Sequence, residues 1–376
     1  MDKKILAYFT LSRLLFISFA LLGTLFVKLD PGYIGKQSAP DAPYLAWIWA
    51  NFDGRHFLNI ATNGYHRSDF AFFPLYPSLI YIFSKLSLIP PLFVGILISS
   101  LTLLISMFML KKITELDYDT PTAYLSIFYL AIIPFSFYGH SVYTDSLFLM
   151  LSTCSLYFAR KKRWILAGLF GAASSASRLS GVALIPALAV EWYLQTKKNG
   201  IQPNEVIKKF FKSGWVSPTL TASGIASYMI YLGIFFKNPL LFQQSMQAWR
   251  QEQFVLPIQV IVRYFKIFLS VDPKLLIYWI AVLEFSTLFI YLGLTLYVWK
   301  NIRKSYAVFM LTLLLLVTFT GTFAGTPRYI LHLFPAFIAL AHITRAKPML
   351  KHILSFFFLI LGFVLTSLFT RGYFVS

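Results

Sequence analysis

The chain has 376 residues, of which 58% are hydrophobic and 12% are charged, and its mean hydropathy is +0.68. A soluble domain carries about 25% charged residues, so this composition excludes an ordinary soluble protein and predicts that most of the surface faces lipid. The net charge of +19 lies in short clusters between apolar runs. This is the positive-inside pattern of a membrane protein, and we expect membrane lipids and no nucleic acid as partners.

The apolar runs recur at a length that crosses a bilayer, which takes roughly 20 residues of helix. We therefore predict an all-α polytopic integral membrane protein with about 10–12 transmembrane helices in one domain, residues 1–376. Arg13 interrupts the first run, but no small-residue cleavage motif follows, so this run is a span and not a signal peptide. The expected spans are 5–27, 90–110, 121–139, 143–159, 164–178, 181–195, 215–236, 275–299, 305–325, 328–344 and 350–370.

The basic clusters define a topology if all of them are cytoplasmic. The large outer loops are then residues 28–89 and 237–274. The N-terminus and Lys111/Lys112 share a side only if an even number of spans separates them. The apolar segment 71–88, which contains Pro74 and Pro77, is therefore predicted to be interfacial or re-entrant. The alternative is that one basic cluster breaks the rule.

The first outer loop carries the most concentrated chemistry. It holds four of the fourteen acids (Asp30, Asp41, Asp53 and Asp69) together with His56 and His66. If 44–62 is helical, Asp53 and His56 share a face at i, i+3, and the carboxylate is a candidate base toward a hydroxyl. The alternative is an interfacial helix whose polar face only meets water. The histidines lack metal-ligand spacing, so no metal is expected.

The second outer loop contains VLPIQVIVRYFKIFL, an amphipathic and aromatic stretch that we expect to lie along the membrane interface. Three charges fall at outer ends of spans in this topology: Asp145, Arg178 and Arg328. A charge at membrane depth is usually paired or functional, and arginine suits a phosphate because its planar fork donates two hydrogen bonds. A purely structural Arg178–Asp145 pair is the alternative. For Glu284 we predict no role beyond helix packing.

The sequence has no P-loop, dinucleotide fingerprint or nucleotide-binding domain. With so little soluble mass, an activated substrate must arrive within the membrane, and no cofactor is expected.

Four stretches carry a family resemblance: FDGRHFLNIA–NGY–FAFFPLYP, HSVYTDSLF, ASRLSGV and TPRYILHLFP. The first resembles the first lumenal loop of the GPI mannosyltransferase family that adds the second mannose, together with its prokaryotic relatives in the GT-C superfamily. The other three follow in the same order over nearly the whole length. Asp145 stands where this family more often has Glu. The chain is also shorter than the eukaryotic members, as expected of a prokaryotic relative.

The resemblance implies an inverting glycosyltransferase, with mannose as the expected sugar, that moves a hexose from a polyprenyl-phosphate carrier to an acceptor hydroxyl. The acceptor is a glycan, glycolipid or protein on the outer face of a prokaryotic plasma membrane. Asp53 is then the catalytic base. The residues expected to bind substrate are Arg55, His56, Tyr143, Asp145, Arg178, Arg328 and Tyr329. Two other readings remain: a transporter or flippase of a lipid-linked or small solute, and a non-catalytic assembly subunit.

Overall fold

The computed structural model describes residues 2–32, 42–198, 208–246 and 255–375. Asp41 and parts of both predicted outer loops lie outside these residues. Over the described ranges, all regular secondary structure is helical, which confirms the predicted all-α class. The chain divides into two compact units, residues 1–150 with 328–376, and residues 151–327.

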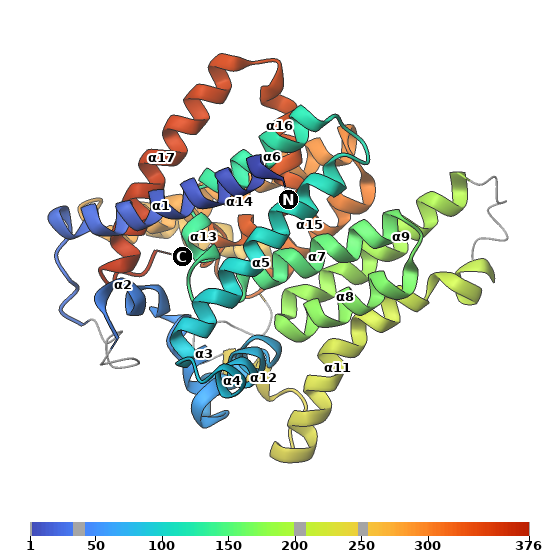
Figure 1. Cartoon of the computed structure of the whole chain (residues 1–376), viewed down its shortest axis with the longest axis horizontal. Helices are drawn as coiled ribbons and strands as arrows, with labels where there is room; N and C mark the ends of the chain where they lie inside the picture. Colours follow the sequence, from blue (N-terminus) through green and yellow to red (C-terminus); the bar gives the residue numbers. More distant parts are fainter. Residues whose placement is uncertain (1, 33–41, 199–207, 247–254, 376) are drawn as a thin grey trace. The chain divides into compact units, whose positions relative to one another are not determined.

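The first unit is built on long helices joined at one end by a set of short ones. Its helices are α1 (Lys3–Phe26), α2 (Tyr44–Trp47), η2 (Ile48–Ala50), α3 (Asp53–Asn63), η3 (Arg67–Ala71), α4 (Leu75–Ser87), α5 (Pro91–Thr114), α6 (Thr120–Ile132), η4 (Ser136–Gly139), the start of α7 (Asp145–Arg160), η8 (Arg328–His332), α16 (Phe334–Arg345) and α17 (Pro348–Thr370). Helices α1 and α17 cross and pack against each other, and α6 packs against α1, α5 and α16 (Figure 1).

The second unit contains the rest of α7 followed by α8 (Trp164–Ser177), η5 (Leu179–Ala183), α9 (Leu184–Lys198), η6 (Phe210–Gly214), α11 (Val216–Phe236), α12 (Leu241–Met246), α13 (Pro257–Ser270), α14 (Leu276–Asn301) and α15 (Lys304–Thr318). Helices α8 and α11 form its tightest pair (Figure 1). A Cβ atom on Gly224 would lie 1.9 Å from the carbonyl oxygen of Ala172. Only glycine permits this approach, which is typical of membrane helix pairs.

Five of the described helices are long and apolar enough to cross a membrane: α1, α5, α11, α14 and α17. Three shorter apolar helices, α6, α8 and α15, accompany them. The protein is therefore an integral membrane protein, as its composition predicts. Several predicted spans are shorter as helices because proline or positive-φ glycine interrupts them. For example, α6 ends at Ile132 ahead of Pro134, and Gly321 and Gly325 lie in the break that follows α15.

The ambiguous segment 71–88 forms the 13-residue helix α4. Pro74 is its N-cap and Pro77 lies in its first turn, where proline is tolerated because those N–H groups have no partner inside the helix. At 1.5 Å per residue the helix is about 20 Å long, which is short for a hydrocarbon core of about 30 Å. This length supports the prediction that the segment does not cross.

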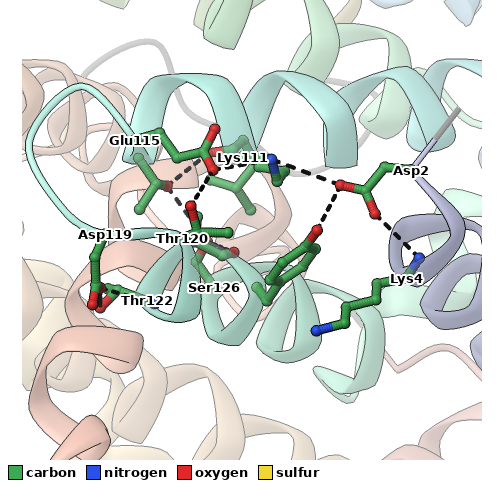
Figure 2. A network of polar contacts seen from close by, with 12 residues as sticks. Asp2, Lys4, Lys111, Glu115, Asp119, Thr120, Thr122 and Ser126 are labelled. Atoms are coloured by element: carbon green, nitrogen blue, oxygen red, sulfur yellow. Dashed lines mark hydrogen bonds and ion pairs between the residues drawn. The ribbon is translucent and has the colours of Figure 1, made fainter.

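A polar network joins the start of α1 to the end of α5 (Figure 2). Asp2 caps α1 through the backbone N–H of Lys4 at 3.1 Å and accepts a hydrogen bond from Tyr124 at 2.7 Å. Lys111 lies 3.7 Å from Asp2 and 2.9 Å from Glu115. Residues 2 and 111 therefore lie at the same end of the unit, so an even number of crossings separates them, as the predicted topology requires.

Arg13, which interrupts the first apolar run, is buried inside the first unit. Its guanidinium donates to the carbonyl oxygen and to the hydroxyl of Ser136, both at 2.7 Å. The charge therefore attaches α1 to Ser136, the first residue of η4.

Candidate active site

The candidate site begins at the first residue of α3. The residue before it, Phe52, has φ 55° and ψ −113°, a conformation that non-glycine residues rarely adopt and that costs about 1–3 kcal/mol. The Phe52 ring packs 5.8 Å from the Phe369 ring and 5.7 Å from the Phe374 ring. The side chain of Asn51, which is fully buried, donates to the carbonyl oxygen of Phe369 at 2.8 Å. These contacts fix the turn that presents Asp53.

Arg328 connects two of the acids that the sequence analysis singled out, Asp53 and Asp145. Its Nη1 donates to Asp53 Oδ2 at 2.8 Å, and its Nε lies 3.4 Å from Asp145 Oδ1. His332 Nε2 lies 3.0 Å from the same Asp145 oxygen. The side chain of Asp145 is 0% exposed, that of Arg328 is 11% exposed and that of Asp53 is 27% exposed. Asp53 is therefore the member of this charge network that a ligand can reach.

One oxygen of Asp53 is bonded and the other is open. The guanidinium of Arg328 occupies Oδ2, while Oδ1 accepts no hydrogen bond from the described part of the chain. A carboxylate fixed on one side and open on the other has the geometry that a general base requires.

Two buried tyrosines form the wall behind Arg328. The guanidinium carbon lies 5.4 Å from the ring centre of Tyr138 and 5.2 Å from that of Tyr143, which are distances for cation–π attraction. The Tyr143 hydroxyl donates to the carbonyl oxygen of Asn51 at 2.9 Å. The predicted site residue Tyr143 thus holds both the arginine and the turn before α3.

The site lies at the end of the first unit opposite the network of Asp2 and Lys111. Arg371, directly after α17, donates from Nε to the carbonyl oxygen of Val27, directly after α1, at 2.9 Å. Asn51 is bonded to the last turn of α17 through Phe369. Asp2, by contrast, stands before the first residue of α1.

His56 and Asp69 form an oriented pair beside Asp53. His56 Nδ1 lies 2.7 Å from Asp69 Oδ1, and the Asn59 amide donates to Asp69 Oδ2 at 2.9 Å. The imidazole stacks on Phe72 with ring centres 4.7 Å apart and an interplanar angle of 12°. Asp69 comes from η3, so the pair also joins the loop after α3 to the helix.

His140 lies beside the site wall and stays neutral. Its Nδ1 lies 2.9 Å from the Ser100 hydroxyl, and its ring meets Trp49 edge-on at 5.3 Å. Burial, together with the nearby charge of Arg13, lowers the pKa of His140 to about 4.

The remaining predicted site residues are less tightly placed. Arg55 lies on α3, and its side chain makes no hydrogen bond or ion pair with the described residues. Tyr329 meets the His332 ring edge-on at 5.0 Å. Arg178 belongs to the second unit, where it ends α8 in an extended conformation and its carbonyl oxygen accepts from Gly181 N at 3.0 Å. Its predicted convergence with Asp145 and Arg328 stays a prediction.

Sequence analysis missed His332, Asn51 and Tyr138. His332 follows Arg328 by four residues in an otherwise apolar stretch, a spacing that places two residues on one helical face and that we could have used. Asn51 and Tyr138 gave no comparable signal, because Asn51 lies between η2 and α3 and Tyr138 lies in the four-residue helix η4, where no periodic pattern marks a face. The described residues contain no group of three or more His, Cys, Asp or Glu side chains that could hold a metal ion.

Comparison with known proteins identifies a solved structure with a similar fold. No protein-family model matches the sequence, and no curated protein is detectably similar to it. Among solved structures, the oligosaccharyltransferase of Archaeoglobus fulgidus in its apo form matches with a TM-score of 0.50 and 13% sequence identity. The match covers 99% of this chain but only 56% of that one. The likeness shows that this chain shares the helical fold of the matched part of that protein.

Proposed function

We propose that this protein is an inverting glycosyltransferase, in which Asp53 is the base, that moves a hexose from a polyprenyl-phosphate carrier to an acceptor hydroxyl. The observation that most directly supports this proposal is the Asp53–Arg328 pair. In this pair an accessible carboxylate lies 2.8 Å from a buried guanidinium, at one end of a membrane-embedded unit. The fold supports the proposal, because one solved structure with a similar fold is an oligosaccharyltransferase, an enzyme of the GT-C type that the family resemblance also implies.

The reaction follows from this geometry. The acceptor oxygen attacks the anomeric carbon and forms the new C–O bond while Asp53 Oδ1 takes the hydroxyl proton. The bond between the anomeric carbon and the phosphate oxygen breaks, and its electron pair leaves with the lipid phosphate. Attack from the face opposite the leaving group inverts the anomeric centre. Arg328 fixes the carboxylate in position, and fixed geometry of this kind accounts for several orders of magnitude in rate.

The lipid phosphate needs cations as its negative charge develops. Arg328 is one candidate, although it already contacts two carboxylates. Arg55 and Arg178 are the other two, and Arg55 in particular has no ion pair with another described residue. Tyr143 and Asp145 are buried, so we propose that they act on the substrate only through Arg328, while His56 and Tyr329 complete the proposed substrate-binding set.

The proposed site faces outward from a prokaryotic plasma membrane. Lys111 and Arg345 lie in contact with Asp2 and Asp119, respectively, at the end opposite the site, and basic ends of this kind stay in the cytoplasm. Mannose as the donor sugar rests on the family resemblance of the first-loop motif.

A transfer assay tests the proposal. Purified protein in nanodiscs receives labelled mannosyl-phosphoryl polyprenol and, as acceptors, a glycolipid and glycopeptide extract of the host membrane. With the wild type we expect a labelled product whose anomeric configuration is opposite to that of the donor. With Asp53→Asn we expect turnover to be at least about a thousand-fold slower. Asp30→Asn, an acid of the same outer loop whose carboxylate accepts from Gly32 N, is the matched control.

The two alternative hypotheses, a flippase and an assembly subunit, predict different results. A flippase moves the lipid-linked sugar across proteoliposomes without forming a covalent product. An assembly subunit copurifies with an active partner, and Asp53→Asn leaves that activity intact. Either result overturns the proposal.

A further inference from the structure

The turn before α3 has a backbone shape that favours glycine at the position of Phe52. Gly54 N donates to the carbonyl oxygen of Asn51 at 3.2 Å, which closes a four-residue turn over residues 51–54. The backbone angles of Phe52, φ 55° and ψ −113°, match the first central position of a type II′ turn, about 60° and −120°, where glycine predominates. The chain therefore carries a large aromatic side chain at a place where the backbone favours none.

Two aromatic residues at the end of α17 hold the Phe52 ring. Phe369 lies in the last turn of α17 and Phe374 follows the helix, and their ring centres lie 5.8 Å and 5.7 Å from that of Phe52. Aromatic rings at such distances attract each other beyond the effect of their burial. Phe369 is fully buried and Val375 is 1% exposed. Residues 369–375 therefore form a packed support for the ring.

A glycine reverses the chain directly before Phe374. The end of α17 is a Schellman motif, in which Tyr373 N donates to the carbonyl oxygen of Leu368 at 3.0 Å and Gly372 N donates to that of Phe369 at 3.2 Å. Gly372 has φ 89°, which is the left-handed conformation that this motif requires. The contact between Phe374 and the turn thus follows from the way in which α17 ends.

Phe369 also supports the other member of the Asp53–Arg328 pair. Its ring centre lies 5.2 Å from that of Tyr138 and 6.0 Å from that of Tyr143. These are the two rings that face the Arg328 guanidinium. One buried aromatic residue therefore lies behind both the turn that presents the carboxylate and the wall that holds the arginine.

We propose that Phe52 is a positioning residue for the reaction: its ring, held by Phe369 and Phe374, keeps the turn in the shape that directs the Asp53 carboxylate to Arg328. A rare backbone conformation that its surroundings maintain beside a reactive group is typical of active sites in which strain is part of the mechanism. This inference rests on the proposed function and adds residues 369–375 to the structure that supports the base.

Three substitutions of Phe52 separate the ring from the backbone strain. Phe52→Ala removes the ring and keeps the strain, because alanine also disfavours positive φ. Phe52→Gly removes the ring and relieves the strain. Phe52→Tyr keeps both. If the ring only stabilises the fold, the rate of transfer follows stability, and the glycine variant is closer to the wild type than the alanine variant.

The first experiment measures apparent Tm and steady-state transfer to the membrane extract for each variant. We expect Phe52→Gly to have a higher Tm than Phe52→Ala. We expect both to lower kcat by about 10- to 100-fold with little change in the KM for donor, because a displaced catalytic group reduces the rate of the chemical step. Phe52→Tyr should keep most of the wild-type kcat.

The second experiment tests the support without relying on activity. Phe374→Ala removes one of the two rings that hold the turn. We expect the amides of Gly54 and Arg55, which donate to carbonyl oxygens of the turn, to exchange hydrogen faster in a peptide that covers residues 51–57. Phe356→Ala is the matched control, because this ring lies on the same helix and is 68% exposed. It should leave the exchange unchanged.

Two results overturn the inference while leaving the proposed function standing. One is a Phe52→Gly variant whose kcat equals that of the wild type or recovers together with its Tm, which would make the ring a stabilising contact only. The other is unchanged exchange over residues 51–57 in Phe374→Ala. If the wild type transfers no sugar, the proposed function fails, and the positioning role fails with it even where Phe374→Ala speeds exchange.

Discussion

Arg328 Nη1 donates to Asp53 Oδ2 at 2.8 Å across 275 positions of sequence. The same guanidinium also reaches Asp145, so one planar fork serves two carboxylates. Lysine is a point charge on a flexible stem and cannot reproduce this arrangement.

Arg328→Lys is therefore expected to lower kcat by about 100-fold, because Asp53 loses its fixed position. Steady-state transfer kinetics measure the effect. Arg345→Lys, which changes a more exposed arginine paired with Asp119, leaves kcat unchanged. Equal effects of the two changes would contradict the positioning role of Arg328.

Asp145→Asn tests the buried end of the same charge network. It removes the carboxylate that faces both Arg328 and His332, and breaking a buried ion pair costs about 3–5 kcal/mol. We expect a clearly lower apparent Tm together with reduced transfer. Asp272→Asn, an exposed acid that caps the backbone N–H of Lys274, is the control. A Tm that Asp145→Asn does not change would show that Asp145 contributes nothing to stability.

Arg13→Met tests whether the arginine inside α1 is structural. The methionine fills most of the volume but leaves the carbonyl and hydroxyl of Ser136 without their donor, and each buried group without a partner costs about 1–3 kcal/mol. We expect a lower apparent Tm and an unchanged KM for donor. Leu14→Met, on an exposed part of the same helix, controls for the methionine. A Tm equal to that of the control would rule out the structural role.

The pKa of His140 predicts acid sensitivity. The folded protein holds this group at a pKa of about 4, below its ordinary value of 6.5, because the imidazole is buried. Unfolding lets it take a proton, so its contribution is intact above pH 6.5 and is lost as the pH falls from 6.5 to 4. The apparent Tm of the wild type therefore falls more steeply over this range than that of His140→Gln. Parallel curves for the two proteins would contradict this.

Asp119 titrates below the pH range in which the effect of His140 is measured. Hydrogen bonds from Thr122 and Arg345 lower its pKa to about 2 from 3.8. Its effect on stability is thus present above pH 3.8 and is lost only as the pH falls toward 2.

Cysteine labelling tests the sidedness of the site. The chain has one cysteine, Cys154, and it is buried. The labelling of an introduced cysteine is therefore measured against a low background signal. In right-side-out vesicles a membrane-impermeant maleimide should label Asn63→Cys at the end of α3 and spare Lys347→Cys before α17. Inverted vesicles should give the reverse pattern. Labelling of Lys347→Cys alone in right-side-out vesicles would place the site in the cytoplasm.

The helical class and the membrane location followed from composition and apolar run length, because the cost of burying backbone polar groups in lipid leaves few alternatives. The helix ends followed less well. Pro134 shortened one predicted span, and Gly321 and Gly325 separate α15 from α16. In each case local backbone chemistry mattered more than the apolar period.

The candidate site was predictable in part. Asp53, Asp145 and Arg328 drew attention as charges beside apolar segments, and the structure brings all three together. Their pairing was not predicted, since the structural pair that the sequence suggested for Asp145 was with Arg178. The contribution of Asn51 depends on one side-chain bond to the backbone at Phe369, and a contact between distant loops leaves no local pattern.

The first unit is interrupted in sequence, since residues 151–327 form the second unit before Arg328 is reached. During synthesis on the ribosome, α7 enters the bilayer carrying Asp145 long before the arginine that neutralises it exists. A nascent chain that stops short of η8 thus exposes an uncompensated acid to lipid. The charge of Asp145 is balanced only after residues 328–332 have been made.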